Sequence, residues 1–127
     1  MSGSSSVVNK RFRLVVPHVD PDNMEFGADE VFYIPSTTFF LDSKQWRGLL
    51  GLWRAMNDAF NLLLDMCEED WLYAKDVEQA LDLVERRRDN KFRAVDQSIE
   101  EYQQSLDIVK DALLEARKYN TCVEFLF

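Results

Sequence analysis

Two long stretches of the chain repeat apolar residues at alternating intervals of three and four, and this pattern limits the possible fold more than any other. One stretch covers residues 46–67 and the other residues 92–116. The apolar positions are Trp46, Leu49, Trp53, Met56, Phe60, Leu63 and Cys67, then Phe92, Val95, Ile99, Tyr102, Leu106, Val109, Leu113 and Ala116. Such spacing keeps one face of an α-helix apolar. We predict a helix over each stretch, with Cys67 in the core.

The ends of these helices carry signals of their own. Asp42-Ser43 supplies an N-cap for the first helix, because either side-chain oxygen can accept from a first-turn amide. Asn120 is a plausible stop for the last one. Gly48 and Gly51 lie about one turn apart in the first helix, a spacing that would let another backbone approach closely. The alternative is that both glycines are simply tolerated there, at a cost of about 1 kcal/mol each.

A shorter repeat over residues 74–84 predicts a further helix between the two long ones. No proline or glycine follows Gly51, so only weak breakers at Asp89-Asn90 separate this helix from the next. One alternative is a single rod over residues 75–118, which would need a partner chain to cover its apolar stripe. The other is two separate helices, which we predict because compact domains are commoner.

Both ends of the chain are rich in strand-forming residues. Residues 10–16 alternate apolar and polar side chains, residues 30–34 form a second short β-prone run, and residues 36–41 read as extended. Residues 121–127 are β-rich and apolar to the last position. We predict an α+β fold: a small three-stranded antiparallel sheet, made of an N-terminal hairpin plus the C-terminal strand, packed on two or three long antiparallel helices. The competing interpretation has the C-terminal residues dock in another protein.

Length and composition are those of one domain. The 127 residues, 46% of them hydrophobic, suffice for a single core. We expect residues 1–6 to be a flexible tail and residues 7–127 to form one α+β domain. Signal-peptide and membrane-spanning patterns are absent from the sequence, and Cys67 and Cys122 lack zinc-type spacing. The sequence therefore predicts a cytoplasmic protein whose cysteines are thiols.

Charge is unevenly distributed along the chain. The net charge of -8 argues against general binding to nucleic acid or to anionic membranes. Residues 65–85 are strongly acidic, with Lys75 as the only base, whereas residues 86–93 are basic, with Asp89 as the only acid. This abrupt reversal is the clearest electrostatic feature of the sequence.

The residue patterns of common catalytic sites are missing. His18 is the only histidine and lies in a loop rich in proline and aspartate. Asp58, Asp65 and Glu68 form a carboxylate stripe, but no matching acidic pair follows on a later helix. All glycines are isolated, so no phosphate-binding loop exists. We predict that the chain is not an enzyme and uses neither a cofactor nor a metal.

These features favour a non-enzymatic protein-binding module. Within that class we predict a small acidic inhibitor, of the immunity or counter-defence type, which blocks a basic protein target by electrostatic steering. The predicted partner-binding residues are Asp65, Glu68, Glu69, Asp70, Trp71, Tyr73, Arg86, Arg87, Arg88 and Arg93. The alternative is a self-assembling structural or adaptor protein, a homodimer formed through the long C-terminal helices.

Overall fold

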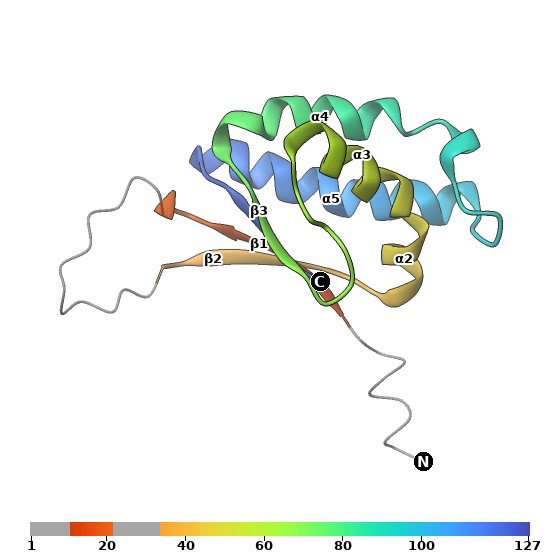
Figure 1. Ribbon diagram of the computed structural model, residues 1–127, viewed down its shortest axis with the longest axis horizontal. Coiled ribbons are helices and arrows are strands. Elements are labelled where there is room, and N and C mark those ends of the chain that lie inside the picture. The colour runs from red at the N-terminus through yellow and green to blue at the C-terminus, as the bar shows by residue number, and fades with distance from the viewer. Residues whose placement is uncertain (1–10, 22–33) are drawn as a thin grey trace, which may run out of the picture.

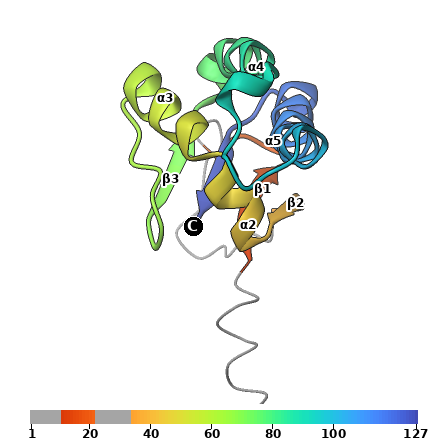
Figure 2. The same ribbon diagram turned by 90° about the vertical axis from the view of Figure 1, so that its right-hand side faces the viewer.

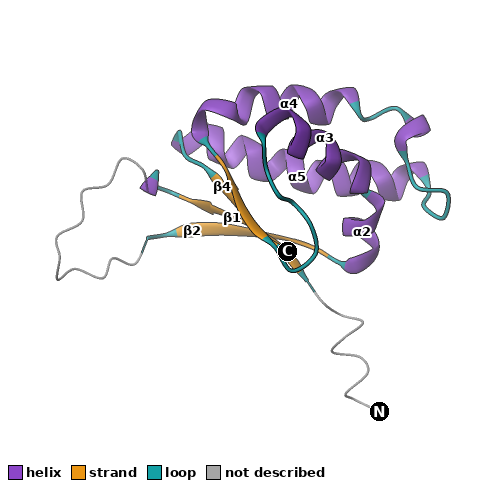
Figure 3. Ribbon diagram, in the orientation of Figure 1, coloured by secondary structure: helices purple, strands orange, loops and turns teal. Residues whose placement is uncertain are grey.

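A computed structural model describes residues 11–21 and 34–127 of the chain. They form two layers, a four-stranded antiparallel sheet and a set of helices that covers one of its faces (Figure 1, Figure 3). The strands are β1 (Phe12–Pro17), β2 (Ser36–Leu41), β3 (Glu69–Leu72) and β4 (Val123–Leu126). The helices are α2 (Ser43–Gly48), α3 (Leu50–Phe60), α4 (Val77–Arg86) and α5 (Ile99–Tyr119), with 3-10 turns η2 (Ala74–Asp76) and η3 (Asn90–Phe92).

The sheet joins both ends of the described chain in the order β2-β1-β4-β3. β1 pairs with β2 on one side and with the C-terminal β4 on the other, so the closing strand and an N-terminal hairpin are confirmed, although the second strand of the hairpin is not the one predicted. The predicted number of three strands is wrong, because β3 adds a fourth strand at the edge beyond β4. Ser36–Leu41 is the second hairpin strand. Most of the strand predicted over residues 30–34 lies outside the described residues, and Ile34 itself is not in a strand.

The core lies between the sheet and the helices. Alternate β1 residues Phe12, Leu14 and Val16 are buried, as the alternating pattern predicts. Trp46 of α2 stacks on Phe12, with 4.7 Å between ring centroids, and meets the ring of Phe127 edge-on. Viewed end-on in Figure 2, α3, α4 and α5 arch over this face of the sheet.

The first predicted helix is divided and ends early. A turn at Leu49 separates α2 from α3, and α3 ends at Phe60, where the C-cap Asn61 adopts the left-handed conformation (φ 55°, ψ 47°). The side chain of Asn57 then accepts from the Leu64 amide and donates to its carbonyl, which reverses the chain toward β3. Leu63 is consequently 58% exposed and Cys67 is exposed, so the prediction that both belong to the core stripe is wrong.

The region predicted as either one rod or two helices forms two. Ion pairs join Glu78 at the start of α4 to Arg117 at the end of α5, and Arg88 beyond α4 to Asp107, so these two helices run antiparallel. The Ser98 hydroxyl accepts from the amide of Glu101 and caps the start of α5. Asn120 ends it in the left-handed conformation, as predicted. No described helix has the length and apolar character needed to cross a membrane.

Candidate protein-binding surface

The sheet face turned away from the helices carries a mixture of aromatic, apolar and charged side chains. We call it the open face, because no helix of the described chain covers it (Figure 1). Strand alternation and register place on it Arg13 and Val15 of β1, Thr38 and Phe40 of β2, Glu69 and Trp71 of β3, and Glu124 and Leu126 of β4. Tyr73, two residues after Trp71, keeps an extended backbone and continues the same face.

Three large aromatic side chains are exposed at the edges of this face. Phe40 is 44% exposed on β2, while Trp71 and Tyr73 are 37% and 50% exposed on and just beyond β3. The guanidinium of Arg11 lies over the Phe40 ring, 5.3 Å from its centroid. Exposed aromatic side chains gathered on one face are typical of protein-interaction sites.

Charged residues occupy the middle of the open face. Glu124 of β4 is paired in register with Trp71 and Val15, and Arg13 is paired with Phe40 and Leu126. Partial burial raises the pKa of Glu124 above its usual 4.5, and the neighbouring carboxylate of Glu69 raises it further, whereas Arg13 acts in the opposite direction. The face therefore holds a carboxylate that is incompletely solvated.

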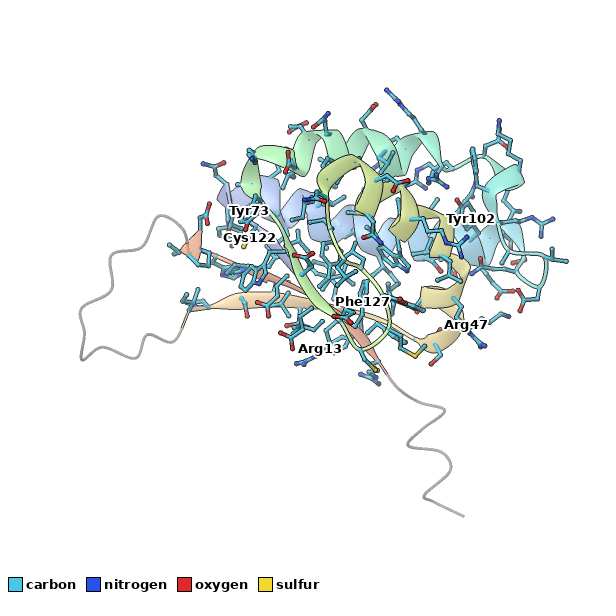
Figure 4. The ribbon with its side chains drawn as sticks, in the orientation of Figure 1. Arg13, Arg47, Tyr73, Tyr102, Cys122 and Phe127 are labelled. Atoms are coloured by element: carbon cyan, nitrogen blue, oxygen red, sulfur yellow. The ribbon has the colours of Figure 1, made fainter. Side chains whose placement is uncertain are left out.

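Within the described part of the chain, one cavity opens on this face at each end of β3. The first, of about 190 Å³, is lined by Trp71 and Tyr73, by Asp20 and Pro21 after β1, and by Cys122 before β4. The second, of about 250 Å³, lies at the start of β3 and includes Arg11, Arg13 and Glu69 in its lining. Figure 4 shows Tyr73 and Cys122 near one end of the sheet, with Arg13 and Phe127 toward the other.

The predicted acidic residues do not all point outward. Glu68 and Glu69 are exposed beside the second cavity. The carboxylate of Asp65 accepts from the Met66 amide within the turn after α3. The carboxylate of Asp70 accepts from the amides of Leu63 and Trp71, at 2.7 and 2.8 Å, and so fastens the preceding loop to β3.

The predicted basic residues contact their own chain. Arg86 pairs with Asp82, and Arg88 pairs with Glu85 and Asp107. Arg93 donates to the carbonyl of Gln97. The guanidinium of Arg87 lies 5.0 Å from the centroid of the Phe92 ring, and its backbone carbonyl accepts from the Tyr102 hydroxyl.

The acidic and basic groups also do not form one surface. β3 leads through η2 into the start of α4, whereas the arginines lie at and beyond its other end (Figure 1). The structure therefore separates Trp71 and Tyr73 from the basic run, which was predicted to belong to the same site.

The apolar repeat over residues 92–116, which we call the seam and which suggested a homodimer, is largely buried within the chain itself. From Tyr102 to Ala116 its residues are buried against the sheet and the neighbouring helices. Only its first part is exposed, with Phe92 and Val95 on the connection between α4 and α5 at 41% and 101% and Ile99 at 37%.

The groups considered for catalysis are dispersed. The His18 ring stacks on Tyr119, with 4.2 Å between centroids, and its Nε2 lies 2.7 Å from the Thr37 hydroxyl. Asp58 lies on α3, but Asp65 and Glu68 follow the end of that helix and do not continue its stripe. Among the described residues, no three His, Cys, Asp or Glu side chains are grouped so as to hold a metal. Neither cysteine forms a disulfide, as predicted.

Several residues of the open face were not identified from the sequence. Only the strand order and register bring these residues close to Trp71 and Tyr73. They are Arg13, Phe40, Asp20, Cys122 and Glu124. Alternation within residues 10–16 and 121–127 indicates which side chains share a face. It does not indicate which strands are neighbours.

Comparisons with models of protein families, with curated proteins and with solved structures give no match to this chain. The class of the protein rests on its own fold: an α+β domain with one sheet face covered by helices and the other presenting aromatic and acidic side chains.

Proposed function

We propose that this chain is a non-enzymatic protein-binding module and, more specifically, a small acidic inhibitor of the immunity or counter-defence kind that blocks a basic protein target. The open face is the proposed binding surface. The observation that carries the proposal is the exposure of Phe40, Trp71 and Tyr73 on the sheet face that the described helices leave uncovered. Rigid aromatic side chains on a sheet supply contact area at a low entropic cost.

The charge of the chain supports a basic target. At -8, the protein accelerates encounters with a positively charged partner by long-range attraction. Glu69 and Glu124 on the open face, with Asp20 at its edge, provide acidic groups where the partner would dock. Because the predicted arginines already contact their own chain, we now assign them to the fold and not to the interface.

Self-assembly is the second candidate and has weaker support. A homodimer through the C-terminal helices would rely on the short exposed part of the seam at Phe92, Val95 and Ile99. Light scattering at micromolar concentrations separates the two proposals. If the protein is a dimer, and if Phe92→Ala and Val95→Ala dissociate it, the self-assembly proposal is favoured. If the protein is a monomer, the inhibitor proposal is favoured.

The inhibitor proposal is tested by comparing matched surface variants. Wild-type protein, a Phe40→Ala/Trp71→Ala variant and a Phe92→Ala/Val95→Ala control are each used to capture proteins from the host of origin. We expect the wild type and the control to retain the same basic protein, and the open-face variant to lose it.

The captured protein is then identified, purified and assayed with the chain. We expect its activity to fall at stoichiometric amounts of the chain, and the association rate to fall steeply as salt is added. Equal capture by all three forms, a salt-independent association rate or a fully active target would each refute the proposal.

A further inference from the structure

The cavity between the end of β3 and the start of β4 combines two aromatic rings with a carboxylate. Its lining consists of Trp71, Tyr73, Asp20, Pro21 and Cys122, and its volume is about 190 Å³. We infer that this cavity binds an arginine side chain of the partner protein, with the guanidinium stacked on the aromatic rings and hydrogen-bonded to Asp20. This inference deepens the proposed function and rests on it for the identity of the ligand as part of a protein.

The spacing of the two aromatic residues suits a flat cation. Trp71 and Tyr73 are two residues apart in extended backbone, so their side chains project on the same side about 7 Å apart along the strand. A planar group inserted between two rings at that separation contacts both at ordinary van der Waals distance. Both side chains are partly exposed, so a ligand can reach them from solvent.

The charges around the cavity select a cation. Asp20 is part of its lining, and the strand register places Glu124 directly beside Trp71. The described lining includes neither lysine nor arginine. By contrast, the cavity at the other end of β3 is lined by Arg11 and Arg13 as well as by Glu68 and Glu69, so the positive and negative charges of its lining balance.

Among cations, the guanidinium of arginine matches this lining best. It is planar, always charged and weakly hydrated, so it stacks on aromatic faces more readily than an ammonium does. Its N–H groups also remain available in the ring plane to donate to the carboxylate of Asp20. A quaternary ammonium has no N–H to donate, and it is usually held by a fuller aromatic cage than two rings can provide.

Partial burial of the neighbouring carboxylate agrees with this assignment. The pKa of Glu124 is raised by burial and by Glu69, which means that its negative charge is incompletely compensated by the chain. A guanidinium bound next to Trp71 would supply the missing positive charge.

The test uses N-acetyl-arginine amide, which presents the side chain without charged ends, and follows the indole N–H signal of Trp71 by NMR. The chain contains three tryptophans, of which Trp46 and Trp53 are buried. The indole signal that disappears in Trp71→Phe is the signal of Trp71. We expect the arginine derivative to shift the indole signal of Trp71 and the backbone amide signals of Asp20 and Cys122. The isosteric but uncharged N-acetyl-citrulline amide should bind about tenfold more weakly.

Variants and a second ligand complete the test. Asp20→Asn and Tyr73→Ala should each weaken arginine binding by about tenfold or more, because they remove a charge-assisted hydrogen bond and a stacking face. Phe40→Ala, which removes an equally exposed aromatic from the opposite edge of the same face, should leave binding unchanged. Tetramethylammonium should bind more weakly than the arginine derivative.

The inference is overturned if the arginine and citrulline derivatives bind equally, if tetramethylammonium binds as well, or if Phe40→Ala weakens binding as much as Tyr73→Ala. Failure here is distinguishable from failure of the inhibitor proposal. A chain that inhibits its captured target but does not bind the arginine derivative retains the proposed function and loses the arginine site. A chain that binds the derivative but inhibits no target retains the site and loses the function.

Discussion

The side-chain amide of Gln97 lies directly against Gly48, so that a Cβ atom on Gly48 would be 2.4 Å from its Oε1 and 2.6 Å from its Nε2. Gly48 is the last residue of α2, and Gln97 precedes the cap of α5. Both residues are buried. The glycine spacing left open whether another backbone approaches Gly48 or the glycine is merely tolerated, and the structure places a side chain against it.

Substitution of Gly48 should therefore destabilise the protein through overpacking. We expect Gly48→Ala to lower the free energy of unfolding by about 1–2 kcal/mol, because the clash with Gln97 outweighs the helical preference of alanine. Adding Gln97→Ala in the same chain should recover most of this loss. Urea unfolding followed by circular dichroism measures both effects.

Gly51 provides the matched control for this experiment. A Cβ there would lie 3.1 Å from Nη1 of Arg87, the mobile end of a long side chain, and Gly51 is exposed. We expect Gly51→Ala to be neutral or to stabilise the chain by up to about 1 kcal/mol. A similar loss of stability in both glycine variants would contradict the steric explanation.

Asp70 should be important for stability even though the sequence placed it at a partner surface. Its carboxylate accepts from the amides of Leu63 and Trp71 and fixes the loop that leads into β3. We expect Asp70→Ala to reduce the free energy of unfolding by about 1–3 kcal/mol, since two backbone donors lose their acceptor. The adjacent Glu69→Ala, on the exposed side of the strand, should change stability by less than about 0.5 kcal/mol. Equal effects at both positions would show that the loop does not depend on Asp70.

Periodicity identified most elements but could not locate the end of the first helix. The three-and-four spacing continues through Leu63 and Cys67, yet the helix stops at Phe60. Two contacts that are distant from the stripe decide this outcome, namely the bonds of Asn57 to Leu64 and the pairing of β3 with the C-terminal strand. Tertiary pairing therefore overrode a local preference, and the fourth strand was missed for the same reason.

The candidate site was predictable only in part. Trp71 and Tyr73 stand out in the sequence because they follow a run of acids, and the structure leaves both exposed. Asp20 and Cys122 reach the same cavity from opposite ends of the chain, which only the order β1-β4-β3 brings together. Arg88 illustrates the reverse case, since a residue in a conspicuous basic run is bound to Glu85 and Asp107 of its own chain.

The contact between α4 and α5 should weaken in acid. A hydrogen bond from Lys110, and the nearby charge of Arg88, lower the pKa of Glu85 below its usual 4.5. Because the pKa of Glu85 is lower in the folded state, the ionised carboxylate stabilises the fold. This stabilisation is present above pH 4.5 and is lost as the pH falls through the folded-state pKa. We expect Lys110→Met to cost less than about 1 kcal/mol at pH 7, since the pair is largely solvated.

The pH dependence of that variant is measured by thermal unfolding at pH 7 and pH 3. The difference in Tm between wild type and Lys110→Met should shrink at pH 3 and also in 1 M salt at neutral pH. Lys118→Met, which removes a looser pair with Glu115 at 3.9 Å, serves as the control and should have a smaller effect. A penalty for Lys110→Met that is the same at both pH values would rule out the ion pair as its cause.

Glu124 on the open face should show the opposite dependence on pH. Its pKa is raised by burial and by Glu69, so the folded protein holds the proton of this carboxyl more tightly than the unfolded chain does. The stabilisation that comes from the protonated Glu124 carboxyl is therefore complete below pH 4.5, and it is lost as the pH rises through the raised folded-state pKa. Glutamine resembles the protonated form, and we expect Glu124→Gln to stabilise the protein at pH 7 but not at pH 3. Urea unfolding at the two pH values measures the difference, and a gain that does not vary with pH would contradict this cause.

The neighbours of Glu124 allow the same effect to be tested without altering the residue itself. Titration of its side-chain carboxyl by carbon-detected NMR gives the pKa directly. Glu69→Gln should lower that pKa, because a repelling charge is removed, and Arg13→Met should raise it, because an attracting one is lost. If neither variant moved the pKa while Glu124→Gln still stabilised the protein at neutral pH, burial alone would account for the shift. The charges of the open face would then be too well screened to act on one another, and a bound cation beside Trp71 would gain little from Glu124.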